Sequence, residues 1–324
     1  MKVLVTGGCG YIGSATARLL RRRGHEVEVL DNLSEGHRAA WDGPFTELEL
    51  LDRDALHGWL QAKQFDGLIH FAARAYVGES VLQPERYWRS NVVPLIHLTE
   101  ALEGVPIVFS STCAVYGEPP VDRLDETLPK APINPYGATK AAAERLLSDR
   151  DGAGHGKYAA LRYFNAAGAE EDGSHGEDHD PETHLIPLAV HAALGLGKAL
   201  TVFGNDWPTP DGTCVRDYIH ILDLAEAHLC ALERLWQGGD SGQWNVGTGR
   251  GASVLEVIQA VEKAAGRPVP WSPGPRRAGD PPFLVANADK AAKDLGWKAQ
   301  WTDLDALVAT AVAWHQSHPA GYSS

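Results

Sequence analysis

The fold is decided by the start of the chain, which reads MKVLVTGGCGYIGSATARLLRRRGHEVEVLD (residues 1–31). A short apolar run is followed by closely spaced glycines, a basic and apolar stretch, and a second apolar run. This pattern predicts a strand, a glycine turn, a helix and a second strand at residues 3–6, 7–13, 14–23 and 27–30. Gly24 ends the helix, and Asp31 ends the second strand. The segment is therefore predicted to form a β-α-β unit.

The order of these features suits a dinucleotide. Glycines let the backbone turn sharply and approach a pyrophosphate, and the N-terminus of the following helix faces the negative charge. Asp31, roughly 20 residues after the turn, can accept hydrogen bonds from the adenosine ribose. An acid at this place also repels a ribose 2′-phosphate, so NAD is favoured over NADP. The alternative is a tight turn between strand and helix that binds no ligand.

Short apolar runs alternate with helical stretches through the first half of the chain. Further strands are expected at residues 67–72, 105–110 and 158–163, and helices at 87–102 and 136–147. Such alternation is typical of an α/β protein with a Rossmann-type doubly wound parallel sheet, covered by helices on both faces.

The composition changes after Gly168. Residues 170–182 are polar and are expected to form a loop, and Pro- and Gly-rich segments recur beyond them. We expect a Rossmann domain at residues 1–168 and a smaller α/β substrate-binding domain at 169–324, with some later segments packing back on the first. Helical candidates for that packing are residues 221–235 and 254–265.

Composition and charge exclude several classes of protein. The 324 residues carry a formal net charge of −13, which argues against nucleic acid or an anionic membrane surface as partner. The four cysteines form no CxxC pair, and no apolar run approaches the ~18 residues of a membrane span. The chain enters a strand without a signal segment, so we expect a cytoplasmic protein with reduced thiols.

Tyr136 and Lys140 are the central candidates for chemistry. Their i, i+4 spacing places them on one face of the predicted helix. A phenol is a poor base at neutral pH, and a neighbouring ammonium stabilises the phenolate and lowers the pKa. Such a pair can remove a hydroxyl proton while a nicotinamide accepts hydride from the same carbon. Thr112, just beyond the strand at 105–110, supplies a hydroxyl that can bond both the substrate oxygen and the tyrosine.

Three motifs together carry a resemblance. The glycine turn, the Ser-Ser-Thr strand end at 110–112 and Tyr-x-x-x-Lys at 136–140 resemble those of the extended short-chain dehydrogenase/reductase family. Within it, the chain resembles the UDP-glucose 4-epimerases nearly from end to end, and the stretch DGTCVRDYIH at 211–220 is similar to the nucleotide-sugar branch. The resemblance implies NAD as cofactor, a UDP-sugar as substrate and a homodimer.

The resemblance also implies roles for individual residues. The catalytic residues would be Thr112, Tyr136 and Lys140, with the tyrosine as base and acid. NAD would be held by Gly7, Gly10, Tyr11, Ile12, Asp31, Asn32, Asp52, Arg53, Phe71, Ala72, Ala73, Asn91, Tyr136, Lys140 and Phe164. The UDP-sugar would contact Thr112, Tyr136, Asn165, His184, Leu185, Val202, Phe203, Arg216, Arg277 and Asp280. Arginines in this set suit a diphosphate, which guanidinium groups bind well.

The activity implied is the reversible 4-epimerisation of UDP-glucose and UDP-galactose through a transient 4-keto sugar. The keto-sugar would turn about its link to the anchored diphosphate and present its other face. Two alternatives stay open: a 4-epimerase of UDP-N-acetylhexosamines or UDP-pentoses, and a non-catalytic NAD-sensing protein. Leu284 occupies the place where a bulky tyrosine would exclude N-acetyl sugars.

No metal is expected in this protein. His175, His179 and His184 share a segment with Glu177 and Asp178, which invites a metal hypothesis. Their spacing fits no zinc pattern, and hydride transfer needs no metal.

Elimination of water is not expected either. Cys113 and Ala114 follow Thr112, at the place where the sugar 4,6-dehydratases of the family carry an Asp-Glu pair. The chain therefore lacks the acid and the base that such chemistry requires.

Overall fold

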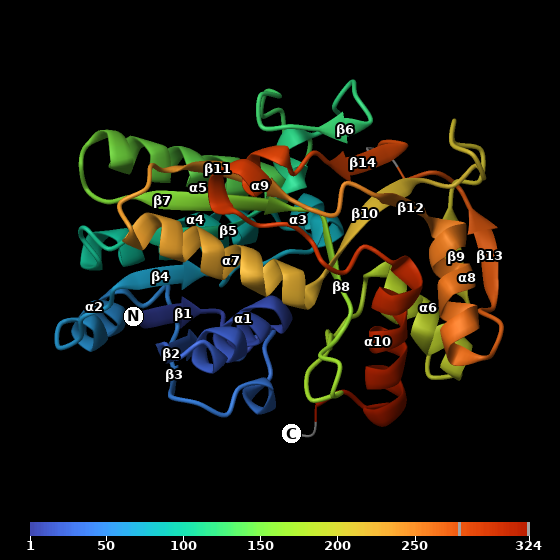
Figure 1. The fold of residues 1–324 in the computed structure, drawn as a ribbon, viewed down its shortest axis with the longest axis horizontal. Helices are drawn as coiled ribbons and strands as arrows, with labels where there is room; N and C mark the ends of the chain where they lie inside the picture. The colour runs from blue at the N-terminus through green and yellow to red at the C-terminus, as the bar shows by residue number, and fades with distance from the viewer. Residues whose placement is uncertain (278–279, 323–324) are drawn as a thin grey trace.

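The computed structural model describes residues 1–277 and 280–322. Its centre is a seven-stranded sheet with the order β11-β7-β5-β4-β1-β2-β3, and every neighbouring pair is parallel (Figure 1). In chain order the strands are β1 (Lys2–Thr6), β2 (Glu26–Asp31), β3 (Phe45–Glu47), β4 (Gly67–His70), β5 (Ile107–Thr112), β7 (Tyr158–Tyr163) and β11 (Gly242–Val246). The predicted fold class is confirmed.

Helices cover both faces of this sheet, because its strands alternate buried residues toward each side. On β1, Val3 and Val5 belong to a core cluster that includes α1 (Tyr11–Arg22) and α7 (Ile221–Trp236). Leu4, between them, belongs to a cluster on the opposite face. That cluster takes residues from α2 (Arg53–Leu60), α4 (Pro84–Ala101) and α5 (Pro135–Gly152).

The strand order reverses between β1 and β4, which are neighbours in the sheet although β2 and β3 separate them in the chain. A ligand of such a sheet binds outside the carboxyl ends of the strands at this reversal. Gly7 follows β1, Phe71 follows β4 and Thr112 ends β5. The fold therefore brings these predicted site residues to one edge.

A second group of elements lies beyond the carboxyl edge of the sheet, on the right in Figure 1. Its main sheet has the order β12-β10-β14-β6, and β8 pairs with β10. Three helices pack together around one apolar cluster beside it. The strands are β6 (Arg123–Leu124), β8 (Asn165–Ala167), β10 (Val215–His220), β12 (Gly251–Ser253) and β14 (Phe283–Ala286). The helices are α6 (Leu185–Leu194), α8 (Val254–Ala265) and α10 (Leu304–Ser317). A separate two-stranded sheet consists of β9 (Leu200–Phe203) and β13 (Trp271–Gly274).

Later segments are divided between the two groups. The helix predicted at 221–235 is α7, which packs against α1 and the large sheet, and β11 completes the edge of that sheet beside β7. α9 (Asp289–Leu295) contacts both β11 and α7. The helix predicted at 254–265 is α8, which packs against α6 and α10 instead of the first sheet.

Helix ends differ from the predicted ones by several residues. α1 begins at Tyr11 instead of Ser14, because the glycine turn is tight enough to place Gly13 inside the helix. α4 begins at Pro84 and α5 at Pro135, each with proline in its first turn, where the missing N–H costs nothing. α3 (Val77–Leu82) precedes α4 and was not predicted.

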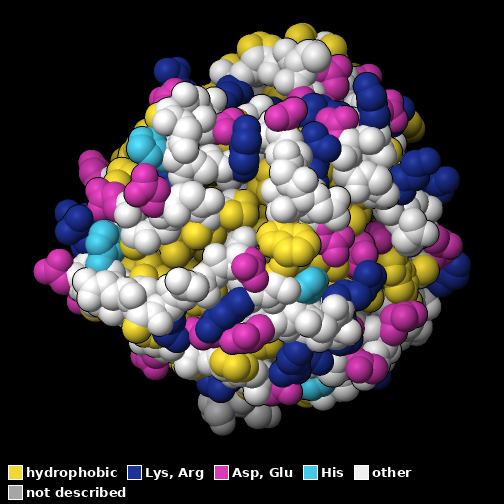
Figure 2. Space-filling view, turned by 60° about the vertical axis from the view of Figure 1, so that its left-hand side comes forward, with side chains coloured by type: hydrophobic (Ala, Val, Ile, Leu, Met, Phe, Trp, Pro, Cys, Tyr) yellow, Lys and Arg dark blue, Asp and Glu magenta, His cyan; other side chains and the backbone are white. Residues whose placement is uncertain are grey.

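Charge is distributed over the surface in both signs. Figure 2 shows acidic and basic side chains interspersed across one face, with apolar patches between them. Among the described residues, no helix combines the length and the apolar character needed to cross a bilayer.

Candidate active site

Within the glycine turn, Gly7 and Gly13 are closely packed against the backbone, whereas the space beside Gly10 is not filled by the protein. Gly7 has φ +72°, and a Cβ there would lie 2.5 Å from the backbone nitrogen of Ala72. A Cβ on Gly13 would lie 2.1 Å from the carbonyl oxygen of Gly7. At Gly10, by contrast, the nearest atom to a Cβ is 3.4 Å away. Gly7 and Gly13 are thus required by packing inside the protein, whereas Gly10 faces room for something else.

The N-terminus of α1 offers donors to fill that room. Gly10 is the cap residue and has no side chain to cap the helix. The first backbone N–H groups of the helix, from Tyr11 onward, have no partner within it. Such a helix end attracts a phosphate through its N–H groups and its dipole. These residues fit a pyrophosphate.

Asp31 is held at the end of β2 by backbone donors. Its Oδ2 accepts a hydrogen bond from the Cys9 nitrogen at 2.9 Å, and its Oδ1 accepts one from the Leu33 nitrogen at 2.8 Å. Burial raises its pKa, and these hydrogen bonds work in the opposite direction. Each carboxylate oxygen can accept a further hydrogen bond, so Asp31 is placed to receive two hydroxyl groups of a ribose.

Other predicted cofactor residues occupy different settings. Asn91 is buried and uses its amide on the Arg74 backbone and on Thr139, so it holds the loop after β4 in place. Asn32 bonds Glu49. Asp52 caps α2, and Arg53 pairs with Glu100 at the surface. Phe71, Ala72 and Ala73 lie after β4, and Phe164 lies buried between β7 and β8.

The three predicted catalytic residues come from neighbouring elements. Tyr136 and Lys140 lie on α5 with 8% and 3% of their surface exposed. The Lys140 ammonium donates to the Ser110 carbonyl of β5 at 2.8 Å and lies 6.0 Å from the centre of the Tyr136 ring. Thr112, two residues after Ser110, ends the same strand. Asn134 begins α5 by accepting a hydrogen bond from the Gly137 nitrogen.

The acid–base properties of this pair differ from the prediction. Burial raises the pKa of Tyr136 well above its usual value, and hydrogen bonding with Thr112 opposes that rise. Burial also lowers the pKa of Lys140 to about 7, although the charge of Glu144 opposes the change. Burial is thus the largest influence on the phenol pKa, and it acts in the opposite direction to the lowering expected from the ammonium.

Strand register links three of the predicted substrate residues, Thr112, Asn165 and Arg216. Thr112 pairs with Tyr163 in the sheet, and Phe164 and Asn165 come next in the chain. Asn165 pairs with Tyr218 of β10, and Arg216 pairs with Leu284 of β14. A continuous path of paired strands thus connects the end of β5 to Arg216.

Cationic and aromatic groups lie farther along this path. One Arg216 nitrogen lies 3.6 Å from Asp280, and another donates to the Pro281 carbonyl at 3.0 Å. The Arg277 guanidinium lies 3.9 Å from the centre of the Phe203 ring. Val202 is buried beside Phe203 on β9. This arrangement combines charges for a phosphate with a flat apolar surface for a base.

Comparison with known proteins decides the family. The model of the NAD dependent epimerase/dehydratase family matches residues 3–247. The chain belongs to the NAD-dependent epimerase/dehydratase family. It is 46% identical to a UDP-glucose 4-epimerase of Lacticaseibacillus casei over 99% of both chains.

Solved structures of the epimerase/dehydratase family agree in fold. The UDP-glucose 4-epimerase from Brucella ovis in complex with NAD has a TM-score of 0.93 at 47% identity, covering 96% of this chain and 97% of that one. The UDP-Glc/GlcNAc 4-epimerase from Campylobacter jejuni has a TM-score of 0.84 at 39% identity, covering 98% and 99%.

The residues after Thr112 narrow the chemistry open to this member of the family. Cys113 and Ala114 begin a short 3-10 turn, and burial raises the pKa of the Cys113 thiol to about 12. A thiol with that pKa stays protonated at neutral pH and is a poor general base. The position therefore does not supply the acid–base pair of a dehydratase.

A buried ion pair beneath the site was missed in the sequence. Glu144, one turn after Lys140, is fully buried and accepts two hydrogen bonds from Arg162 of β7, at 2.8 and 2.6 Å. Ser111, next to Thr112, donates to the same carboxylate at 2.6 Å. The pair fixes α5 against β5 and β7, and so holds Tyr136 over the sheet. The sequence does place Glu144 on the helix face of Tyr136 and Lys140, but this spacing does not reveal Arg162 as its partner.

We expect Glu144→Gln to destabilise this epimerase/dehydratase by about 3 kcal/mol or more, because it leaves the buried Arg162 charge without its partner. Chemical unfolding measures the change. The matched control is Asp149→Asn, which breaks an exposed ion pair with Arg145 on the same helix and should cost about 0.5 kcal/mol or less. Equal effects of the two changes would contradict a structural role for the buried pair.

His184, a predicted substrate contact, is instead engaged with acids. It is the cap residue of α6, and its Nδ1 lies 2.8 Å from Glu177 and 3.0 Å from Glu182. Burial would lower the pKa of His184, but the two carboxylates outweigh it and raise the pKa to about 10. Leu185 begins α6 directly after it. Only the other edge of the imidazole is left for a substrate.

Proposed function

We propose that this chain catalyses the reversible 4-epimerisation of UDP-glucose and UDP-galactose, with NAD as its cofactor. The observation that carries the proposal is the buried Tyr136–Lys140 pair, set over the Thr112 end of β5. This strand lies two strands from β1, which leads into the glycine turn. The full-length similarity to UDP-glucose 4-epimerases supports the substrate. We also propose that residues 1–168, with α7 and β11, bind NAD and that most of residues 169–324 bind the sugar nucleotide.

The site residues would have different roles in the reaction. NAD bound in this site would supply the acceptor and donor of hydride for C4 of the sugar. Tyr136 accepts the proton of the 4-hydroxyl as the hydride leaves, and donates it back when the hydride returns to the other face of C4. Thr112 positions the same oxygen. Lys140 supplies positive charge that favours the phenolate in the loaded site.

Epimerisation further requires that the sugar turns while the nucleotide stays fixed. Arg216 and Arg277 would hold the diphosphate, and Phe203 would pack against the uracil. These groups lie on β9, β10 and the segment before Asp280, away from Tyr136 on α5. The protein would thus bind the UDP part of the substrate tightly, and the 4-keto sugar can rotate about its bond to the diphosphate before it is reduced.

The test is an assay on the purified protein as it is obtained. UDP-galactose is added without NAD, the reaction is quenched, and nucleotide sugars are separated by chromatography. We expect UDP-glucose to form, because NAD would remain bound through turnover. Conversion of UDP-N-acetylgalactosamine or a UDP-pentose alone would favour the first alternative. No product from any UDP-sugar, even with NAD added, would favour the NAD-sensing alternative.

Leu284 offers a test of substrate choice. It pairs with Arg216 in register and packs on the cluster that includes Phe164. We expect Leu284→Tyr to reduce kcat/KM for UDP-N-acetylgalactosamine at least tenfold more than for UDP-galactose, because the larger ring would fill room beside the sugar. Leu284→Met, which nearly conserves volume, is the control. Parallel losses on both substrates would exclude a role of this position in selectivity.

A homodimer is also proposed, formed through α4 and its neighbours. Trp88 and Ile96 on α4, with Val81 and Leu82 on α3, are exposed apolar side chains. Exposed apolar groups on adjacent helices are typical of a protein–protein interface. We further propose a cytoplasmic location, which agrees with four free cysteines.

A further inference from the structure

Two histidines and two glutamates come together in the segment between β8 and α6. They are Glu177, His179, Glu182 and His184, and their ligand atoms all lie within 4.8 Å of one another. Glu177 is 5% exposed. His179 lies between two tyrosine rings, Tyr11 of α1 and Tyr76 at the start of α3, each edge-on at 6.3 Å. The four side chains therefore form a compact cluster, in which Glu177 is buried and the other three residues are half-buried.

Four of the distances within the cluster lie near the edge lengths of a coordination tetrahedron, although they involve both oxygens of Glu182. His184 Nδ1 lies 2.8 Å from Glu177 Oε1 and 3.0 Å from Glu182 Oε1. His179 Nδ1 lies 3.3 Å from Glu177 Oε1 and 3.5 Å from Glu182 Oε2. Nitrogen and oxygen ligands about 2.0–2.2 Å from a tetrahedral zinc ion are separated by about 3.3–3.5 Å. Small movements would suffice to seat an ion.

Hydrogen bonding leaves one of these atoms unused. His179 Nδ1 is buried and makes no hydrogen bond of normal geometry, although it lies 3.3 Å from Glu177 and 3.5 Å from Glu182. A buried polar atom without a partner is costly and calls for an explanation. An ion shared by the four side chains would satisfy this nitrogen by coordination.

The charges of the cluster are compatible with such an ion. Two carboxylates in the interior require two positive charges nearby. A divalent cation with two neutral imidazoles supplies them as completely as two imidazolium ions would. Imidazole and carboxylate together are ligands typical of zinc and similar transition metals, whereas calcium and magnesium prefer oxygen alone.

We propose that Glu177, His179, Glu182 and His184 bind one divalent transition-metal ion, with zinc as the best fit. Four protein ligands leave no open position, so the ion is structural and takes no part in hydride transfer. The sequence spacing matched no zinc pattern because all four ligands come from one irregular loop of eight residues (177–184) instead of two paired motifs.

The surroundings of the cluster hold its ligands in position. The Glu182 carboxylate accepts hydrogen bonds from the Thr183 and His184 backbone nitrogens, at 2.6 and 2.7 Å. Such outer contacts orient the ligands of a metal. The Glu182 carboxylate is thus held in place by the backbone that follows it.

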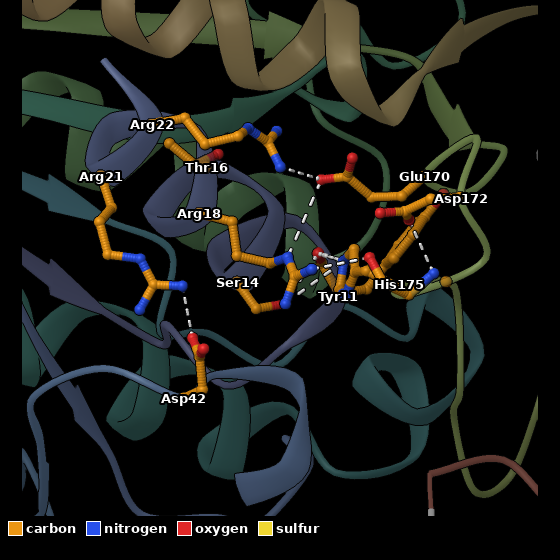
Figure 3. Close-up of polar contacts among 12 residues, drawn as sticks. Tyr11, Ser14, Thr16, Arg18, Arg21, Arg22, Asp42, Glu170, Asp172 and His175 are labelled. Carbon is orange, nitrogen blue, oxygen red and sulfur yellow. Dashed lines mark hydrogen bonds and ion pairs between the residues drawn. The ribbon is translucent and has the colours of Figure 1, made fainter. Parts of the chain in front are cut away.

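Just before the cluster, the same loop is anchored to α1. Figure 3 shows Arg22 reaching Glu170 and Arg18 extending toward the loop; Arg18 donates to Ser174 at 2.7 Å. His175 contacts the Tyr11 carbonyl oxygen at 2.9 Å through its Nε2. A bound ion would therefore tie the turn at Tyr11 to the start of α6. It would join the proposed pyrophosphate site to the proposed sugar-nucleotide site.

The test measures metal content in the complete, untagged protein. The protein is treated with a chelator, dialysed against zinc and then against metal-free buffer, and analysed by mass spectrometry of metals. We expect about one zinc per chain and a melting temperature higher than that of the stripped protein. With cobalt(II) in place of zinc, we expect the visible absorption bands of a tetrahedral site. These readouts do not depend on turnover, so they remain informative if the epimerase assay fails.

A pair of variants assigns the ion to these residues. The double variant E177Q/H179Q should retain less than about a tenth of the zinc and lose the cobalt spectrum. The matched control E103Q/H155Q changes an exposed Glu–His pair at the surface and should bind zinc like the unaltered chain. Unaltered protein that takes up no zinc and gives no cobalt bands would overturn the proposal. Full zinc binding by E177Q/H179Q would overturn the assignment to this cluster. If that variant does not fold, the single variant H179Q is measured in its place, and a cobalt spectrum that it retains unchanged would overturn the assignment.

Discussion

Tyr136→Phe will lower kcat for UDP-galactose by about 10³-fold while the protein keeps its bound NAD. The substitution removes only the hydroxyl that exchanges the proton of the sugar, and general acid–base groups contribute about 10²- to 10⁴-fold. The glycine turn and Asp31, on β1 and β2, are untouched by the change. The measurements are turnover under saturating substrate and the nucleotide released on denaturation.

Tyr158→Phe is the matched control for this result. Tyr158 begins β7 and is buried, but it lies at the opposite end of the strand from Tyr163, which pairs with Thr112. Losing its hydroxyl should leave kcat within about a factor of two. If Tyr136→Phe turns over at the normal rate, another group transfers the proton. If it loses NAD as well, the phenol is a binding group and its chemical role is not established.

Lys140→Met will abolish most turnover and yet raise the melting temperature of the nucleotide-free protein near pH 6.5. Burial lowers the pKa of this amine to about 7 from a usual 10.5. Below pH 7 the amine is charged in both states, so the folded state bears the full cost of burying the charge. Methionine removes that cost, which is on the order of a few kcal/mol, so a rise of about 5 °C or more is expected.

The lowered pKa of Lys140 also predicts how the free energy of unfolding depends on pH. Between about pH 7 and 10.5 the unfolded chain binds a proton at Lys140 that the folded chain does not, so the free energy of unfolding rises with pH across this window. Lys140→Met should lose this slope. Lys298→Met, at an exposed lysine, should change neither the slope nor the melting temperature. A Lys140→Met protein that melts below the unaltered one at pH 6.5 would refute the assumed cost.

Much of this site follows from local sequence because its parts are local. The β-α-β unit, the acid at Asp31 and the Tyr136–Lys140 spacing each lie within a few turns of chain. Their meeting at one edge follows from the rule for parallel sheets, since β1, β4 and β5 all end there. The fold class could therefore be predicted and is confirmed, whereas the residue roles remain proposals.

The rest depends on contacts between distant segments, which spacing does not reveal. The expected lowering of the phenol pKa considered only the neighbouring ammonium, whereas both side chains are buried and the ammonium is bound to the Ser110 carbonyl. Arg162 gave no sign of pairing with Glu144, 18 residues earlier. His179 and His184 matched no pattern because an irregular loop has no period from which to read their meeting.

β11 reaches its place beside β7 only after the chain has built much of the other half. The Tyr158 nitrogen donates to Ser241, 83 residues later, and Gly242 pairs with Ala159. When the first 168 residues have emerged from the ribosome, β7 is therefore an edge strand without a partner on its outer side. At that stage α7 does not yet cover its part of one face of the sheet. Such an edge pairs readily with foreign strands. The order in which the strands are synthesised thus differs from their order in the sheet. The newly made residues 1–168 therefore need protection from such pairing until β11 and α7 have also emerged.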